Sequence, residues 1–332
     1  MRLALAAACA FFAQTGGAPA TRQSLLEARL AAIARASGST VGVFVEHLER
    51  REAARLNAAR PFPLASTFKL PLAVVALRAV ERHELPPLDG KVRLEATDML
   101  PWASPLYERM PTGGEASLRE VLASLLEASD NSAADALLRL CGGPAHVRAE
   151  LAALGLPGIS IDRNEAEIAL DSAGVAHPPA AEWTAAGIGA RTRSVPRPQH
   201  LAALRRFRAD PRDHATPEAM ARVLARIWRG ELLTAPHRAV LREGLARCHT
   251  GARRLRAGLP PQTAVADRTG TCNGLGDDDT ICANDVGVLT LPSGEHVIVA
   301  AFVEDAGGPV AAKERVLAAI ARAVWDAYEK PR

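Results

Sequence analysis

Apolar residues recur with strand or helix spacing near both ends of the chain. Residues Leu25 to Ala36 have helical periodicity, and the β-branched run from Val41 to Glu46 predicts a strand that pairs with Glu52 to Leu56. Strand patterns return after about Gly251 and are followed by a long amphipathic helix. These later segments are Thr263–Thr271, Val286–Leu291 and His296–Val303, with a turn at Pro292-Ser293-Gly294, and the helix Gly308–Tyr328. We therefore expect both ends of the chain to build one sheet with helices on it.

The middle of the chain, from about Ala65 to Trp228, has a mostly helical pattern. The sequence Ser117-Leu118-Arg119-Glu120 is a capping box that opens a helix running to about Leu126. Ser132-Ala133-Ala134-Asp135 resembles a second capping start, and Gly142-Gly143-Pro144 ends that helix. Two capped helices are therefore expected here, joined by a short link.

This order of segments predicts the fold class α/β plus all-α. An antiparallel sheet is flanked by helices of the N- and C-terminal segments, a helical lobe is inserted, and the active site lies in the cleft between them. We expect a single domain over residues 21–332. Its α/β lobe comprises residues 21–60 and 250–332, and its helical lobe comprises residues 61–249.

Composition places the chain among ordinary soluble globular proteins. Of its 332 residues 48% are hydrophobic and 23% charged, and the net charge of +3 arises from mixed acidic and basic positions. The sequence has no lysine-rich block and no interleaving of basic and aromatic residues, which argues against nucleic-acid binding. The nine histidines lack metal-binding spacing, since His83-Glu84 has no second histidine in register. We expect no metal, no cofactor and a monomer.

The first 20 residues have the layout of a secretory signal peptide. Arg2 is followed by an apolar stretch from Leu3 to Ala13, and Ala18-Pro19-Ala20 offers a small-residue cleavage site. The apolar stretch is too short to span a bilayer. We expect cleavage near Ala20 and a mature protein that is periplasmic or secreted and has no membrane segment. Cys9 leaves a lipoprotein as the alternative.

Four cysteines remain after cleavage, an even number in an oxidising compartment: Cys141, Cys248, Cys272 and Cys282. Cys272 and Cys282 bracket nine residues with the composition of an exposed turn. Because the flanking strands are expected to be antiparallel neighbours, we predict a disulfide between these two cysteines. Two alternatives stay open: both are unpaired, or one of them pairs with Cys248.

Three short motifs carry candidate chemistry. In Ser66-Thr67-Phe68-Lys69 the serine and the lysine are three residues apart, so a helix places hydroxyl and amine on one face. The lysine can take the serine proton if burial lowers its pKa, and the neighbouring residues are apolar. Ser129-Asp130-Asn131 lies in the link between the two capped helices, and Arg268-Thr269-Gly270-Thr271 lies on a predicted strand. Each motif alone also fits a capped helix, a helix linker or an ordinary strand.

Together and in this order, the motifs resemble those of the serine β-lactamase and penicillin-binding protein superfamily. Arg163-Asn164-Glu165-Ala166-Glu167 extends the resemblance to class A β-lactamases, because it is similar to their Ω-loop with its catalytic glutamate. Further segments similar to class A enzymes are Pro63-Leu64-Ala65, Ser104-Pro105, Cys141–Pro144, Thr250-Gly251, Arg254–Pro260 and Asn284-Asp285. The likeness covers nearly all of residues 25–328.

The resemblance implies hydrolysis of the β-lactam ring of penicillin- and cephalosporin-type antibiotics. Ser66 would attack the lactam carbonyl and form an acyl-enzyme, and Lys69 would accept its proton, alone or with Glu165 through a water. Ser129 would relay a proton to the departing lactam nitrogen. Glu165 would activate the water that releases the product.

The resemblance also implies substrate contacts. Asn131 would orient Lys69 and hold the side-chain amide of the substrate, and the backbone N–H groups of Ser66 and Thr271 would form the oxyanion hole. The remaining contacts would line the site of the substrate carboxylate. They comprise Ser129, Arg268, Thr269 and Gly270 of the motifs, with Arg254 as an additional anchor.

Two single residues depart from the class A pattern. Arg268 stands where most relatives carry lysine, and this version of the motif favours penicillins and carboxypenicillins. Ala169 stands where the family commonly has an asparagine that helps to hold the deacylation water. Because alanine has no side-chain hydrogen-bonding group, slow turnover is one implication.

The Ω-loop is also enlarged. Asp213 is similar to the aspartate that closes this loop by pairing with Arg163, and its distance from Ala169 implies an insertion of about 35 residues within residues 170–212. From Ser172 onward the segment is rich in Pro, Ala and Arg. We expect it to be irregular, apart from a helical turn at Leu201–Phe207.

Two alternative functions share the chemistry of Ser66 and Lys69. The first is a D,D-peptidase or transpeptidase that acts on cell-wall peptide, and the loop glutamate Glu165 argues against it. The second is a penicillin-sensing module that stays acylated. Ala169 and the insertion favour it, whereas the lack of a recognisable membrane helix or partner domain in the sequence argues against it.

Overall fold

The computed structural model describes residues 21–179, 182–272, 279–305 and 308–329. The predicted signal peptide, with Cys9, lies outside the described residues. So does most of the turn expected between Cys272 and Cys282, because residues 273–278 are not described.

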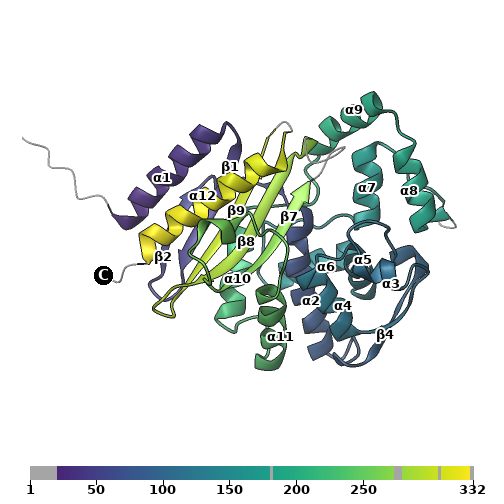
Figure 1. The fold of residues 1–332 in the computed structure, drawn as a ribbon. Coiled ribbons are helices and arrows are strands. Elements are labelled where there is room, and N and C mark those ends of the chain that lie inside the picture. Colours follow the sequence, from purple (N-terminus) through teal and green to yellow (C-terminus); the bar gives the residue numbers. More distant parts are fainter. Residues whose placement is uncertain (1–20, 180–181, 273–278, 306–307, 330–332) are drawn as a thin grey trace, which may run out of the picture.

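Five strands form one antiparallel sheet in the order β2-β1-β9-β8-β7 (Figure 1). The strands are β1 (Thr40–His47), β2 (Glu52–Leu56), β7 (Val265–Cys272), β8 (Cys282–Thr290) and β9 (His296–Glu304). Strand β1 from the N-terminal part pairs along its whole length with β9 from the C-terminal part, for example Val43 opposite Ala301. The prediction of one sheet built from both ends is therefore confirmed, although β8 begins four residues earlier than the pattern indicated.

Helices cover both faces of this sheet. Helices α1 (Arg22–Ser37) and α12 (Val310–Tyr328) lie on one face, where Val43 of β1 belongs to their apolar cluster. Helix α10 (Pro217–Trp228) lies on the other face, where the next residue, Phe44, belongs to the second cluster. Double coverage explains why β1, β8 and β9 are buried on both faces rather than on one.

The remaining helices belong to the other lobe, in which α2 (Lys69–Glu81) is buried except for Arg78 and Glu81. They are α3 (Pro105–Arg109), α4 (Leu118–Glu127), α5 (Asn131–Leu140), α6 (Pro144–Ala153), α7 (Glu165–Ala173), α8 (Ala185–Arg193), α9 (Arg197–Arg208) and α11 (Ala235–Ala246). Helix α2 packs against α4, α5, α6 and α11. Two short strand pairs join this lobe, β3 (Phe62–Pro63) with β6 (His214–Ala215) and β4 (Lys91–Leu94) with β5 (Gly114–Ser117). Short 3₁₀ turns span Ala65–Phe68, Ala96–Asp98 and Leu255–Gly258.

Both predicted helix starts can be compared with their caps. The capping box of α4 is present, with the Ser117 and Glu120 side chains each bonded to the other's backbone N–H. The start predicted at Ser132 is wrong: α5 begins at Asn131, and the Asp130 carboxylate accepts the N–H of Ala133. The Ser132 hydroxyl instead bonds to neighbouring loop groups, so tertiary contacts decided which side chain caps the helix.

Two further expectations need correction. The segment from Ser172 to Asp213 is not irregular, because it contains α8 and the 12-residue helix α9, of which only Leu201–Phe207 was expected as a turn. Its apolar residues pack on α7, which supplies the stabilisation that the local sequence lacks. Helix α10 falls in the range assigned to the helical lobe but packs on the sheet. No helix in the described part of the chain is long and apolar enough to cross a membrane.

Candidate active site

The candidate nucleophile lies where a tight turn enters α2. Ser66 is part of the 3₁₀ turn Ala65–Phe68, and Lys69 is the first residue of α2. Ala65 has φ of 44°, an uncommon left-handed conformation for a residue with a side chain. The Lys69 Nζ donates a hydrogen bond to Ser66 Oγ at 3.2 Å, so the two motif residues do meet as the helical spacing predicts.

Lys69 is fully buried and has several polar partners. Its Nζ lies 2.5 Å from Asn131 Oδ1, 2.8 Å from the Ser129 carbonyl oxygen and 3.0 Å from Glu165 Oε1. Burial lowers the pKa of Lys69, and the positive charge of Arg268 lowers it further, while the Glu165 carboxylate opposes this shift. A buried amine with a lowered pKa can accept a proton from the adjacent hydroxyl.

The link between α4 and α5 is held in place by Asp130. This carboxylate is completely buried and accepts hydrogen bonds from Ser104 Oγ and the Leu106 N–H, each at 2.7 Å. Ser129 next to it has φ of 61°, so the link is bent in a conformation that tertiary contacts must enforce. The bend places the Ser129 hydroxyl 3.4 Å from Lys69 Nζ.

Glu165 is the first residue of α7, and hydrogen bonds to Asp135 hold its backbone in place. Asp135 of α5 accepts the N–H of Glu165 at 2.7 Å and that of Ala166 at 3.2 Å. Burial and the nearby Glu165 charge raise the pKa of Asp135 well above its usual range. The sequence analysis missed this role, although Asp135 lies one helical turn after Asn131 and so shares its face of α5.

Strand β7 borders the nucleophile on the open edge of the sheet. A Cβ atom at Gly270 would lie 2.8 Å from the Leu64 carbonyl oxygen and 3.0 Å from the Thr67 nitrogen, so only glycine allows this approach. Asn284 of β8 fixes the same turn by donating to the Pro63 carbonyl oxygen at 2.7 Å. The strand motif and the nucleophile turn are thus in direct contact.

The two arginines predicted to bind a substrate carboxylate are deeply buried. Arg268 donates to the Leu126 carbonyl oxygen at 2.8 Å, at the end of α4, and to Thr250 Oγ1 at 3.2 Å. Thr250 Oγ1 lies 2.6 Å from Thr269 Oγ1, and both threonines line the cavity whereas Arg268 does not. The hydroxyl pair therefore stands between the Arg268 charge and the cavity.

Arg254 donates most of its hydrogen bonds to strands β7 and β8 of the sheet. Its guanidinium donates to the carbonyl oxygens of Gly270 at 2.8 Å and Asn284 at 2.9 Å, and to Thr271 Oγ1 at 2.5 Å. These bonds hold the part of β7 that carries Thr271. Only 5% of Arg254 is exposed, although the residue also borders the cavity.

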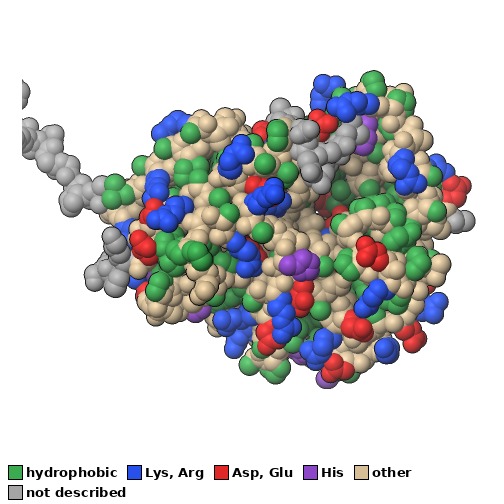
Figure 2. Space-filling view, viewed as in Figure 1, with side chains coloured by type: hydrophobic (Ala, Val, Ile, Leu, Met, Phe, Trp, Pro, Cys, Tyr) green, Lys and Arg blue, Asp and Glu red, His purple; other side chains and the backbone are tan. Residues whose placement is uncertain are grey.

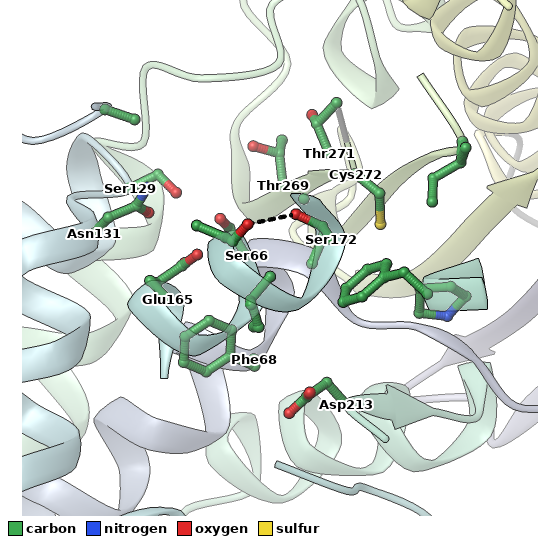
Figure 3. A pocket seen from close by; sticks show the side chains of 18 of the residues that line it. Ser66, Phe68, Ser129, Asn131, Glu165, Ser172, Asp213, Thr269, Thr271 and Cys272 are labelled. Atoms are coloured by element: carbon green, nitrogen blue, oxygen red, sulfur yellow. Dashed lines mark hydrogen bonds between the residues drawn. The ribbon is translucent and has the colours of Figure 1, made fainter. Parts of the chain in front are cut away.

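The predicted residues converge on one cavity of about 520 Å³ (Figure 3). Figure 3 shows Ser66 at its centre, with Ser129, Asn131 and Glu165 on one side and Thr271 on the other. Of the predicted site residues, those that line it are Ser66, Ser129, Asn131, Glu165, Asp213, Arg254, Thr269, Gly270, Thr271 and Cys272. Four of the predicted site residues do not line the cavity: Lys69, Arg163, Arg268 and Cys282.

The enlarged loop is closed by three partly buried carboxylates around the buried Arg163. Arg163 pairs with Asp213 at 2.6 Å, as the sequence predicts, and also with Asp171 at 2.8 Å and Asp210 at 3.3 Å. Asp171 and Asp210 belong to the insertion, so the added segment is tied into the same cluster. The Arg163–Asp213 pair thus holds the two ends of the enlarged loop together. Because α7 begins two residues after Arg163, the pair also fixes the position of Glu165.

The predicted disulfide is present at the end of β7. Cys272 and Cys282 face each other across β7 and β8, are bonded, and have Cα atoms 4.9 Å apart. Cys141 and Cys248 are free and buried, so the alternative pairing with Cys248 does not occur in this structure.

Comparison with known proteins assigns the family. Residues 25–328 match the model of the Beta-lactamase enzyme family. An ancestral class A β-lactamase has a structure that is 29% identical in sequence, with a TM-score of 0.73 over 91% of this chain and 100% of that one. This chain belongs to the class A β-lactamases.

Individual class A relatives are similar over most of their length. The chain is 30% identical to the carbapenem-hydrolyzing β-lactamase KPC of Klebsiella oxytoca, over 86% of this chain and 83% of that protein. It is 26% identical to β-lactamase VEB-1 of Pseudomonas aeruginosa, over 89% of this chain and 88% of that one. The structure of a β-lactamase from Chitinophaga pinensis aligns with a TM-score of 0.75 at 30% identity, over 91% and 99%. This β-lactamase is therefore a hydrolase that opens β-lactam rings.

Proposed function

We propose that this β-lactamase hydrolyses its substrates through an acyl-enzyme on Ser66, which a water activated by Glu165 then releases. The observation that carries the proposal is the convergence on Lys69 Nζ, with Ser66 Oγ 3.2 Å away and Glu165 Oε1 3.0 Å away. A nucleophilic hydroxyl, a buried amine base and a carboxylate within hydrogen-bonding reach are the groups that two-step acyl transfer needs.

In the acylation step, Ser66 Oγ bonds to the lactam carbonyl carbon while its proton passes to Lys69 Nζ. The negative charge that develops on the carbonyl oxygen is held by the backbone N–H groups of Ser66 and Thr271. The carbon–nitrogen bond of the ring then breaks, and the nitrogen takes a proton from the Ser129 hydroxyl. Lys69, 3.4 Å from Ser129 Oγ, returns a proton to that hydroxyl.

In the deacylation step, Glu165 takes a proton from a water that attacks the ester carbon. As the ester bond breaks, a proton passes from Glu165 through Lys69 to Ser66 Oγ, which restores both groups. Ala169 lines the same part of the cavity without a side-chain hydrogen-bonding group. Glu165 therefore positions this water with less help than an asparagine there would provide, and deacylation is the slower step.

The substrate carboxylate is assigned to the hydroxyls of Ser129, Thr250 and Thr269. The buried Arg268 charge supports this site from behind through its hydrogen bond to Thr250. We propose penicillins as the main substrates, because the Arg268-Thr269-Gly270 version of the strand motif favours them. We also propose that the protein is exported and is a monomer. The signal-like N-terminus and the disulfide support export.

The covalent step is tested with Ser66→Ala. The parent incubated with benzylpenicillin should gain the mass of one penicilloyl group, and the variant should gain none, with an unchanged circular dichroism spectrum. A penicilloyl adduct on the folded variant would overturn the assignment of Ser66.

The deacylation step is tested with Glu165→Gln, which removes the basic carboxylate and keeps the shape. The variant should acylate and then hold the adduct, with deacylation slowed by about a hundredfold or more. Equal deacylation rates in parent and variant would refute the role of Glu165. A parent that itself retains the adduct indefinitely would favour the sensing module instead.

A further inference from the structure

The insertion contributes one wall of the active-site cavity. Leu204, Phe207 and Arg208 of α9 line the same cavity as Ser66, on the side where α7 presents Ala169 and Ser172. Helix α9 packs along α7, and its N-terminal residue Arg197 pairs at 3.4 Å with Asp279, three residues before the start of β8. The helix thus connects the Ω-loop with the edge of the sheet across one end of the cavity (Figure 1).

This wall consists of the apolar side chains of Leu204 and Phe207 with the positive charge of Arg208 beside them. Leu204 is only 5% exposed, and Phe207 is half-buried with one ring face covered by the Arg163 guanidinium, 4.8 Å from the ring centroid. Helix α9 contains four arginines and no acidic residue. Basic side chains gather over α9 at the top of the space-filling view (Figure 2).

Arg208 is the cation of α9 that borders the cavity. Its ionic contact is with Glu304 at 3.8 Å, and that carboxylate is already shared with Arg60 at 3.3 Å. Two guanidinium groups facing one carboxylate leave a net positive charge, and the Arg208 side chain is 41% exposed. Arg212, the next arginine along the lining, differs because Asp171 and Asp210 neutralise it.

The direction of the cavity indicates which part of a substrate reaches α9. In Figure 3, Ser129 and Ser172 lie on opposite sides of Ser66, and Ser172 belongs to α7, on which α9 packs. The ring carboxylate and the acylamino side chain of a penicillin leave its lactam ring on opposite sides. With the ring carboxylate at Ser129 and Thr269, the acyl side chain therefore extends toward α7 and α9.

We propose that α9 forms a subsite for the acyl side chain of the substrate, with Leu204 and Phe207 contacting an aryl group and Arg208 attracting an anionic group on that side chain. The preferred substrates are then penicillins whose acyl side chain carries both an aromatic ring and a carboxylate. This inference rests on the proposed function and adds substrate selection by a segment that only the insertion provides.

A matched pair of substrates tests the subsite. Benzylpenicillin and its α-carboxy derivative carbenicillin differ by one carboxylate on the acyl side chain, so the ratio of their kcat/KM values isolates that group. In Arg208→Gln the ratio of carbenicillin to benzylpenicillin should fall about fivefold relative to the parent, as expected for a partly exposed charge pair, and further in Arg208→Glu. The control is Arg205→Gln, an exposed arginine of the same helix that does not line the cavity; its ratio should equal that of the parent.

Each outcome decides a separate point. Since the ratio is taken within one variant, a general loss of folding or catalysis cancels. An unchanged ratio in Arg208→Glu, or an equal fall in Arg205→Gln, overturns the α9 subsite and leaves the proposed function standing. If the parent acylates with neither penicillin, the proposed function fails and the subsite fails with it.

Discussion

At the scale of single residues, the site depends on charged groups removed from water. Lys69, Asp130 and Arg268 are completely buried, and Asp135 is nearly so. Burying a charge is costly unless hydrogen bonds and opposite charges compensate for the lost hydration, and each of these groups has several such partners. The hydrogen-bonding partners fix the geometry around Ser66, while burial itself lowers the pKa of Lys69.

The lowered pKa of Lys69 predicts a pH dependence of acylation. The neutral amine is the base, so the acylation rate should rise with pH along a limb whose midpoint lies below the ordinary lysine value of 10.5. In Glu165→Gln the carboxylate that opposes the shift is gone, so the midpoint should move to still lower pH. Stopped-flow acylation over a pH series measures both midpoints. A midpoint at or above 10.5, or an upward shift in the variant, would contradict the role given to Lys69.

Asp135 is predicted to act as a positioning residue for Glu165. Asp135→Ala removes both hydrogen bonds to the start of α7, so deacylation should slow roughly tenfold while acylation changes less. Asp135→Asn keeps one acceptor and should give an intermediate value. The decisive quantity is the ratio of the deacylation to the acylation rate constant, and an equal fall in both would mean that Asp135 only stabilises the fold.

At the scale of elements, α7 and β7 present the reacting groups, and each is held at its end. Helix α7 starts on the Asp135 carboxylate, and the Arg163 cluster anchors the loop that leads into it. Among the described residues, strand β7 has no neighbouring strand on its outer edge, but Gly270 lets it lie against the nucleophile turn and the disulfide joins its end to β8. Edge strands and loops are otherwise the parts of a protein that open most readily.

The disulfide is expected to stabilise the end of β7. Because it closes a short loop, its removal in the double variant Cys272→Ser with Cys282→Ser should lower the free energy of unfolding by about 2–3 kcal/mol. Urea unfolding with and without reductant provides the control. Reduction should lower the free energy of unfolding of the parent by this amount and leave that of the double variant unchanged. Identical midpoints for parent and variant without reductant would show that the bridge contributes nothing.

At the scale of the whole molecule, the sheet is closed by residues from the two ends of the chain. Strand β9 lies between β1 and β8, and α12 packs beside α1 on the same face. These contacts join segments separated by more than two hundred residues, so neither end can complete the fold alone. The cleft between the sheet and the helical lobe forms only when this long-range pairing is in place.

The packing of α12 can be tested with a matched pair of leucines. Leu317 of α12 is completely buried on the sheet, whereas Leu25 of α1 is 60% exposed. Leu317→Ala should lower the free energy of unfolding by about 2–5 kcal/mol, because it removes apolar contacts and leaves a cavity. Leu25→Ala, the same chemical change at the surface, should stay within about 0.5 kcal/mol of the parent. Similar values for the two variants in chemical denaturation would contradict the packing described.

The sequence by itself determined the strands of the main sheet, several of the helices and the catalytic motifs. Strand and helix periodicity are local properties, and the capping box at Ser117 satisfies backbone groups within its own helix. The spacing of Ser66 and Lys69 fixes their contact once the 3₁₀ turn that leads into α2 forms, because three residues make one turn of such a helix. The paired cysteines followed from the strand pattern in the same way.

Only the tertiary structure decided the rest. Helices α8 and α9 are stabilised by packing on α7, which the composition of a segment rich in Pro and Arg does not reveal. The burial of Arg268 behind Thr250 and the support of Glu165 by Asp135 join residues from separate elements. The wall that α9 adds to the cavity arises likewise from such long-range contacts. Side chains far apart in sequence meet only after the chain has folded, so local sequence patterns do not specify which residues they contact.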